Sequence, residues 1–312
     1  MSRPWSRWIG GSREDPRRRR TPEASSSVCL PVRVRGLRPF RRRPRLLLAW
    51  LRAGAPPGRA GGGRHRALQD VRARLKRGTP YLARSHPPTL ATLVRAALRE
   101  RDLVPRGATL LIAVSGGPDS MALLHVLSGL RRSLAFGLFA HGVDHGLRSE
   151  SAHELDVAEI FAHSLDVPFE RTRLRIAPGG NLQARARAER WEALRSAAVR
   201  AGASRIATGH HADDRAETIL MRMLRGTGYR GLAALPPRDG DRVRPAIRAR
   251  RSDIESHVTR HQIPHCVDPS NRDPRFLRVR VRHEILPALE RLNPRAVEHL
   301  CALADELCAT KG

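Results

Sequence analysis

From residue 89 onward, short apolar runs alternate with longer stretches whose apolar residues recur at helical spacing. The run ATLLIAV at 108–114 is continuous and ends in glycines, which is typical of a strand buried on both faces. Similar patterns predict strands at 134–140, 168–176, 204–208 and 242–247. Helical spacing predicts helices over 89–101, 121–130, 151–165, 181–202, 213–225, 252–261 and 276–292, and from 294 onward.

The order of these elements predicts an α/β fold. Strands that alternate with helices are typical of βαβ units. We therefore expect a parallel sheet of about five strands with helices on both faces, followed by a short C-terminal helical extension. The expected organisation is an arm over 1–88, a core over 89–248, and a helical extension with the start of a linker over 249–312. Ligands in such sheets bind beyond the carboxyl ends of the strands.

Positive charge is concentrated near the N-terminus. The 312 residues include 58 basic and 30 acidic ones, and residues 1–90 hold 23 of the basic but only 4 of the acidic residues. This segment is rich in Arg, Pro and Gly and cannot bury enough apolar surface to offset chain entropy, so we expect 1–88 to be mostly disordered. A basic RNA-binding tail, an organellar targeting peptide and a translation start assigned too far upstream stay open, and we favour the last.

The charge by itself is weak evidence for a nucleic-acid partner. Of the 58 basic residues, 56 are Arg, and only Lys76 and Lys311 are Lys. Selection for phosphate contacts would use both residue types, because either neutralises a phosphate. A GC-rich genome explains the arginine bias at least as well.

Cysteine spacing and hydropathy exclude other classes. No two cysteines have CxxC spacing, which argues against a zinc or iron–sulfur site and favours a reducing, cytoplasmic location. No apolar run approaches the roughly 18 residues that a membrane-spanning helix needs, so we expect no membrane partner. The cysteines are Cys29, Cys266, Cys301 and Cys308.

A tight polar turn, SGGPDS, follows the first predicted strand. Gly116 and Gly117 let the backbone approach a ligand closely, and the next helix directs its N-terminal amides and dipole at the turn, which makes an anion site. The turn matches neither a Walker A loop nor GxGxxG. Asp119 is unfavourable beside a phosphate unless a cation such as Mg²⁺ lies between them. Asp119 as a simple helix cap stays open at this point.

A second polar cluster, HHADDRAE, follows the fourth predicted strand. It puts His210 and His211 at the strand end, Asp213 and Asp214 at the start of a helix, and Glu217 one turn further along. The helix dipole explains one of these acids well. The complete cluster is better explained by a second metal position or by substrate orientation.

Together these motifs resemble the tRNA(Ile)-lysidine synthetase family of N-type, PP-loop ATP pyrophosphatases. There are two departures: Val279 stands where the family has Asn, and only 18 residues follow Pro294, whereas many members carry further C-terminal domains that bind tRNA. The matching segments cover about residues 90–300 in the family's order: SGGPDSMALL (115–124), VDHGLR (143–148), HHADDRAETILMRMLRGTGYRGLAAL (210–235), RPAI (244–247), DPSNRD (268–273) and RHEILPAL (282–289).

The resemblance implies an adenine-nucleotide alpha-hydrolase type of fold, with 89–248 as the PP-loop core, and a ligase that uses ATP and Mg²⁺. Such an enzyme adenylates the C2 oxygen of the wobble cytidine in tRNA(Ile) with a CAU anticodon. The amine of free lysine then displaces AMP and gives lysidine. This amine must be neutral to attack, although its ordinary pKa is about 10.4. Asp214 is our candidate for its proton acceptor, and Asp213 stays open as the alternative.

The resemblance also implies roles for individual residues. Asp119 and Asp214 would lie nearest Mg²⁺. The loop that binds ATP would consist of Ser115, Gly116, Gly117, Pro118, Asp119 and Ser120. The catalytic set would be Asp119, Asp214, Asp213, His210, His211 and Glu217. Contacts to substrate or RNA would come from Asp144, His145, Arg148 and Arg225.

Two other function classes stay open. One is another PP-loop tRNA-modifying enzyme such as a thiolating transferase, although these often use CxxC pairs. The other is a non-catalytic basic RNA-binding protein, which needs neither Asp119 nor Asp214. Without further C-terminal domains, the tRNA would be held with the help of a partner chain, as in a homodimer, by the arm, or by segments missing from this sequence.

Overall fold

A computed structural model describes residues 88–144, 146, 150–175, 180–268 and 273–309, so the predicted arm lies outside the described residues, apart from its last residue. The strands are β1 (Thr109–Val114), β2 (Gly137–Asp144), β3 (Phe169–Arg173), β4 (Ala203–Ala207), β5 (Arg238–Asp239) and β6 (Arg242–Val243). The helices are α2 (Leu90–Glu100), α3 (Pro118–Leu134), α4 (Glu150–Ser164), α5 (Leu182–Arg200), α6 (Ala212–Leu224), α7 (Tyr229–Leu232), α8 (Arg251–His261), α9 (Leu277–Arg280), the π-helical turn η2 (Val281–Ile285), α10 (Leu286–Leu292) and α11 (Ala296–Ala309).

The strands form one sheet in the order β3-β2-β1-β4-β6-β5. All neighbouring strands are parallel except β5 and β6. The predicted α/β fold with a mostly parallel sheet is therefore confirmed. The structure adds one short antiparallel strand at the edge.

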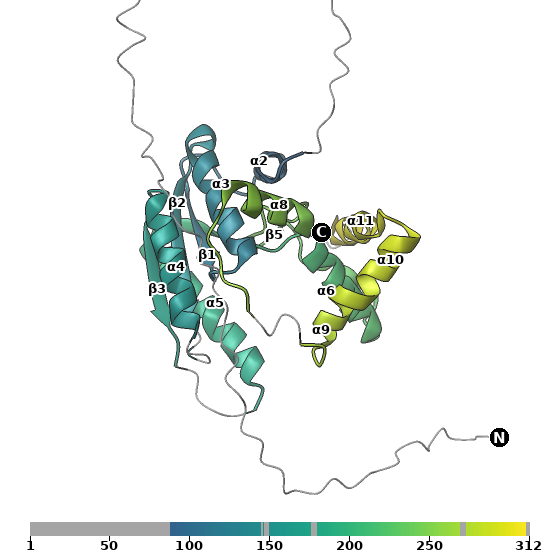
Figure 1. Ribbon diagram of the computed structural model, residues 1–312. Helices are drawn as coiled ribbons and strands as arrows, with labels where there is room; N and C mark the ends of the chain where they lie inside the picture. Colours follow the sequence, from purple (N-terminus) through teal and green to yellow (C-terminus); the bar gives the residue numbers. More distant parts are fainter. Residues whose placement is uncertain (1–87, 145, 147–149, 176–179, 269–272, 310–312) are drawn as a thin grey trace, which may run out of the picture.

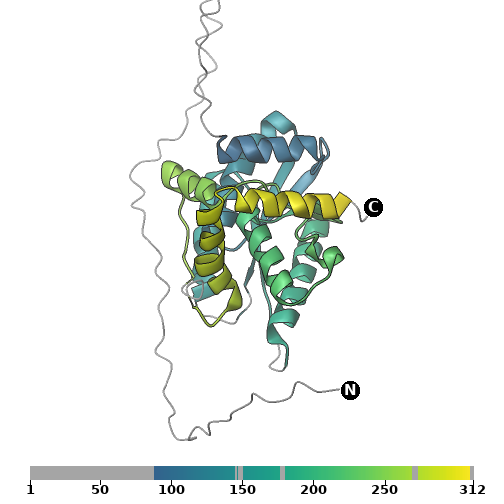
Figure 2. The ribbon, with the colours of Figure 1, turned by 90° about the vertical axis from the view of Figure 1, so that its right-hand side faces the viewer.

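Helices cover both faces of the sheet (Figure 1). Side chains of β1 alternate between two apolar layers, because successive residues of a strand point to opposite faces. Leu110 and Ile112 pack with α2, α3, α4 and α8, whereas Leu111 and Ala113 pack with α5. Thus α8, which the sequence pattern groups with the extension, belongs to a layer that covers the sheet. Helices α10 and α11 pack against α6 instead, as Figures 1 and 2 show.

Three boundaries differ from the predicted ones for local reasons. Helix α3 begins at Pro118, three residues early, because proline suits a first turn where its missing N–H would have no helical partner. The same helix continues until Ala135 adopts φ 53° and ends it, so β2 begins later than predicted. Strand β6 has only two residues, since Pro245 cannot donate a hydrogen bond to a sheet.

The predicted irregularity near Pro287 is present as the turn η2. A proline ring clashes with the carbonyl four residues earlier in an α-helix, which here belongs to His283. The chain adopts a π turn just before it, and the Leu286 N–H donates to the Val281 carbonyl, five residues back. The helix predicted over 276–292 is thereby divided into α9, η2 and α10.

The strand order positions a binding site. From β1 the chain builds outward through β2 and β3, and then returns to β4 on the other side of β1. The loops after β1 and β4 therefore meet where the strand order reverses. In open sheets of this type, ligands bind in the crevice at that reversal, beyond the carboxyl ends of the strands.

One buried arginine joins α6 to α11. Arg215 is only 2% exposed, and its guanidinium donates to the Ala234 carbonyl at 2.9 Å and to Asp305 of α11 at 2.7 Å. Asp305 also accepts from Arg101 at 3.0 Å. This contact holds the last described helix against the core.

We expect Arg215→Ala to lower the free energy of unfolding by about 2 kcal/mol, because it removes one of the two guanidinium partners of Asp305 and leaves the Ala234 carbonyl unpaired. Urea unfolding measures the change. Arg95, exposed on α2, provides the control: Arg95→Ala should stay within about 0.5 kcal/mol of the parent. Equal stability of the two variants would contradict the structural role of Arg215.

Candidate active site

A polar cleft of about 1190 Å³ lies beyond the carboxyl ends of β1 and β4. This exceeds the roughly 300–1,000 Å³ of pockets for single small ligands, so the cleft has room for a nucleotide and part of a second substrate. It brings together most of the site residues that the sequence predicts. Those that line it are Ser115, Gly117, Pro118, Asp119, Ser120, His210, Asp213, Asp214 and Glu217.

The turn after β1 has the shape of an anion-binding loop. The Ser120 hydroxyl accepts the Ser115 N–H at 3.2 Å and donates to the Gly117 carbonyl at 3.0 Å, which closes the turn. Gly116 adopts φ 78°, and a Cβ there would lie 2.6 Å from the Glu154 carbonyl oxygen, so only glycine fits. Helix α3 begins directly after the turn, and its first amides and dipole favour a negatively charged ligand.

The loops after β1 and β4 touch through their backbones. A Cβ at Gly209 would lie 3.0 Å from the carbonyl carbon of Asp119 and 3.1 Å from the Ser120 nitrogen. A side chain at this position would therefore push the two loops apart. Glycine here lets the segment that carries the histidines lie directly against the anion-binding loop.

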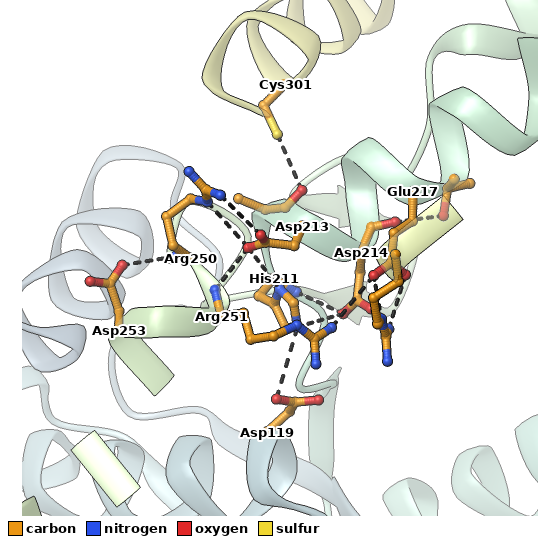
Figure 3. A network of polar contacts seen from close by, with 12 residues as sticks. Asp119, His211, Asp213, Asp214, Glu217, Arg250, Arg251, Asp253 and Cys301 are labelled. Carbon is orange, nitrogen blue, oxygen red and sulfur yellow. Dashed lines mark hydrogen bonds and ion pairs between the residues drawn. The ribbon is translucent and has the colours of Figure 1, made fainter. Parts of the chain in front are cut away.

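His211 is the buried centre of the charged cluster (Figure 3). Its Nδ1 lies 3.4 Å from Asp213, and its Nε2 lies 3.4 Å from Asp214 and 3.9 Å from Asp119. Neither ring nitrogen reaches hydrogen-bond geometry, so these contacts are ion pairs by distance. Burial alone would lower the pKa of His211, but the three carboxylates outweigh burial and raise the pKa.

Asp213 connects the N-termini of α6 and α8. Its carboxylate accepts the Arg251 backbone N–H at 2.8 Å and the Arg250 guanidinium at 3.1 and 3.3 Å. Burial would raise its pKa, yet the nearby His211 ring, together with hydrogen bonds from Arg250 and the Arg251 backbone N–H, holds the pKa well below its usual range. Both oxygens are therefore engaged within the protein.

Asp214 and Glu217 bind the C-terminal segment to α6. Glu217 is 0% exposed and accepts from Arg278 at 2.8 Å and from Arg282 at 2.6 and 3.0 Å. Arg251 adds a third guanidinium at 3.5 Å. Asp214 accepts from Arg278 at 3.0 Å and lines the cleft. Burial would raise the pKa of Asp214, but His211 and Arg278 outweigh burial and lower the pKa.

Asp119 is the least engaged carboxylate of this cluster. Its side chain is 36% exposed, and the nearest cationic group, His211, is 3.9 Å away. Burial raises the pKa of Asp119 because His211 offsets only part of the desolvation. Within the described ranges, no group of three or more His, Cys, Asp or Glu residues has metal-binding geometry. A divalent cation here would rest on few carboxylates and on the ligand's phosphates, as Mg²⁺ often does.

The other predicted residues lie in varied places. His210 lines the cleft and shares a hydrogen bond of 2.8 Å with the Thr208 hydroxyl, and burial lowers its pKa to about 4. Asp144 closes the turn after β2 by accepting the Gly146 N–H at 2.8 Å. Arg225 is exposed at the end of α6 and does not line the cleft. His145 and Arg148 lie outside the described residues.

Sequence reasoning missed the arginines of the site. Arg278 and Arg282 are four positions apart on a helical segment, a spacing that puts both on one side. Arg190 of α5 also lines the cleft, and burial together with Arg187 lowers its pKa. Among 56 arginines this spacing is a weak signal, because arginines recur at helical spacing throughout the chain.

These features define a class of protein: a nucleotide-binding PP-loop protein, built on a parallel sheet covered by helices on both faces. The PP-loop domain family matches residues 91–289. The fold is similar to the U34-tRNA thiolase NcsA from Methanococcus maripaludis, with a TM-score of 0.60 over 70% of this chain and 78% of that one. At 19% identity, this likeness concerns the fold alone.

Sequence comparison specifies the family further. The chain is 40% identical over 229 residues to the tRNA(Ile)-lysidine synthase of Thermobifida fusca, covering 72% of this chain and 70% of that protein. It is 37% identical to the same-named protein of a Synechococcus strain, covering 73% and 69%. The protein therefore belongs to the tRNA(Ile)-lysidine synthase family. Some relatives are longer: the chain covers 46% of the Symbiobacterium thermophilum protein at 40% identity.

The raised pKa of His211 predicts a pH-dependent contribution to stability. A group whose pKa is higher in the folded state stabilises it fully below its unfolded pKa, about 6.5, and loses this effect as pH rises through the folded pKa. The stability difference between the parent and His211→Asn should thus be larger at about pH 6 than at about pH 8. Urea unfolding at both pH values measures it.

His210 provides a control of opposite sign. Its pKa in the folded state is lowered to about 4, so its contribution to the stability of the fold is lost as pH falls below its pKa in the unfolded state. The stability difference between the parent and His210→Asn should be smaller at about pH 6 than at about pH 8. If the two variants changed in the same direction, the electrostatic account of His211 would be wrong.

Proposed function

We propose that this protein is an ATP-dependent ligase that joins lysine to the wobble cytidine of tRNA(Ile) with a CAU anticodon. The products are lysidine, AMP and pyrophosphate. The observation that carries the proposal is one cleft in which an anion-binding loop with Asp119 lies against a buried carboxylate–arginine cluster. A nucleotide site thus adjoins a site for a second, charged substrate. The names of the relatives support the choice of tRNA(Ile).

ATP use follows from the PP-loop family. The turn from Ser115 to Ser120 and the amides at the start of α3 would hold the phosphates. Asp119 would hold Mg²⁺ together with the phosphates, and Asp214 is the next carboxylate around His211. When bound, Mg²⁺ neutralises phosphate charge and orients the nucleotide. Arg190 adds a positive charge to the same cleft.

The reaction has two balanced steps. The C2 oxygen of cytidine attacks the α-phosphorus of ATP, and the bond to pyrophosphate breaks. The lysine amine then attacks C2, and the bond between C2 and the oxygen of AMP breaks. Adenylation is needed because a ring carbonyl oxygen is a poor leaving group, whereas AMP is a good one.

The contacts support Asp214 as the residue that receives the amine's proton. Asp213 accepts three hydrogen bonds, from Arg250 and from the N-terminus of α8. Asp214 accepts two, from Arg278 and from the His211 backbone N–H, and it lies beside the same ring nitrogen of His211 as Asp119. Asp214 lines the cleft, and its lowered pKa keeps it ionised, so it can bind the lysine ammonium before the proton leaves. Asp214 would take the proton as the amine attacks and would release it at once to solvent, because its pKa is lowered.

Several parts of the proposal rest on the sequence alone. They are the core over 89–248, the extension over 249–312, the cytoplasmic location and the homodimer. The chain covers about half of several relatives, such as the 48% of the Thermotoga maritima protein. Further contacts to the tRNA would then come from a second copy of the chain. In the described part of the chain, no helix is long and apolar enough to cross a membrane.

The direct test is lysine transfer to unmodified tRNA(Ile) bearing CAU, with ATP, Mg²⁺ and radiolabelled lysine. We expect incorporation by the parent and a loss of roughly 10²–10³-fold in kcat for Asp119→Asn, the range for removal of one preorganised charge-stabilising group. Asp102→Asn is the matched control, since Asp102 is exposed and has φ 43°, which Asn tolerates. Pyrophosphate release without lysine transfer would contradict the proposal.

Asp214→Asn separates the two steps. We expect it to retain adenylation of the tRNA, followed with ATP labelled at the α-phosphate, but to lose transfer of lysine. Asp213→Asn should perform both steps and instead lower the melting temperature, because Asp213 holds α8. Loss of lysine transfer in Asp213→Asn alone would reverse the assignment.

A further inference from the structure

An exposed aromatic ring stands at the mouth of the cleft. Among the large hydrophobic side chains of the described residues, the exposed aromatic ones are Tyr229, 63% exposed, and Phe276, 44% exposed. Tyr229 lies on α7 and does not line the cleft, whereas Phe276 does. The active-site chemistry described above gives Phe276 no task.

The backbone of Phe276 is held firmly although its side chain is open to solvent. Its N–H donates to the Asp273 carbonyl at 3.2 Å, and its carbonyl accepts from the N–H groups of Val279 at 2.9 Å and Arg280 at 3.2 Å. It caps α9, whose Arg278 binds Asp214 and Glu217. The ring is therefore presented from a segment that the site itself anchors.

The segment around Phe276 is basic. From Asp273 to Glu284 there are four arginines and two acidic residues. Arg275 pairs with Asp273 at 2.6 Å and Arg280 pairs with Glu284 at 3.6 Å, yet both arginine side chains stay largely exposed, at 86% and 57%. An exposed ring next to arginines is the combination that binds unpaired nucleic acid, because bases stack on the ring and guanidinium groups contact the phosphates.

We propose that Phe276 is a stacking platform for an unpaired base of the RNA strand that enters the cleft. This inference rests on the proposed function in taking RNA as the substrate. The adenine of ATP is the other source of a nucleobase. The RNA is favoured because the basic segment suits a strand with several phosphates, and because the phosphates of ATP already have the loop from Ser115 to Ser120.

The test compares Phe276→Ala, Phe276→Leu and Phe276→Trp in the full chain. The RNA probe is a hairpin with a CAU loop that carries 2-aminopurine beside the wobble cytidine. Its Kd is measured at constant salt by anisotropy, and stacking is followed by quenching of 2-aminopurine fluorescence. The Kd for ATP with Mg²⁺ is measured by calorimetry. Leu292→Ala is the control, because Leu292 is 86% exposed on α10 and does not line the cleft.

We expect Phe276→Ala and Phe276→Leu to raise the Kd for RNA by roughly 5- to 100-fold and to reduce quenching, as loss of one stacked base does. Phe276→Trp should retain both affinity and quenching. The Kd for ATP should not change in any variant, and Leu292→Ala should match the parent. Unchanged affinity for ATP also shows that the variants are folded.

Three results would overturn the inference. If Phe276→Leu binds RNA as tightly as the parent, an apolar side chain of similar size is enough for binding and no base stacks on the ring. Weaker ATP binding with unchanged RNA binding would assign the ring to adenine, and no change in either would leave it without a ligand. The RNA-binding assay contains no lysine. If RNA binding depends on Phe276 but the parent protein transfers no lysine, only the proposed function is wrong. If the parent protein transfers lysine but Phe276→Ala binds RNA as tightly as the parent, only the inference about Phe276 is wrong.

Discussion

A carboxylate with no access to water, Glu217, determines how this site is assembled. An unpaired buried charge costs several kcal/mol, so a buried carboxylate must bring its counter-charges with it. Here Arg251 comes from the start of α8, and Arg278 and Arg282 come from the segment that forms α9 and η2. That requirement draws the C-terminal helices over the end of α6 and builds the outer wall of the cleft. Asp214 also contacts Arg278 and Arg282, but among the described residues only Glu217 contacts all three guanidinium groups.

His211 extends the same electrostatic balance to the nucleotide side. It faces carboxylates from the loop after β1 and from the first turn of α6. When protonated it therefore attracts both loops, which the strand order has already placed side by side. The acids then have different tasks. Asp213 is held by α8, Asp214 faces the cleft as an ionised group, and Asp119 keeps an exposed oxygen for a cation and phosphate. In the proposed ligase, adenylation and lysine attack would use neighbouring parts of one charged surface.

The elements that sequence reasoning predicted well are those with short-range causes. The apolar run of β1 and the glycine turn after it follow from local burial and from backbone conformation, and Gly116 adopts the positive φ that such a turn needs. The clustering of Asp119, Asp214 and Glu217 in one cleft also agrees, because the carboxyl ends of parallel strands share an edge. The late start of β2 was missed because Leu134 is as suitable for a strand as for the last turn of α3, and the left-handed residue Ala135 decides between them.

The sequence by itself determined the α/β fold, the nucleotide loop and the family, because periodicity and loop motifs depend on residues close together in the chain. Tertiary structure decided which acidic side chains face a substrate and which basic side chains pair with these acids. Adjacent residues Asp213 and Asp214 look equivalent in sequence, yet Asp213 is bound by Arg250 and the N-terminus of α8, whereas Asp214 is bound by Arg278 of the C-terminal segment. The arginines that bind Glu217 lie 34, 61 and 65 positions away. Ion pairing depends on distance in space, and in a chain with 56 arginines only the folded structure selects the partners.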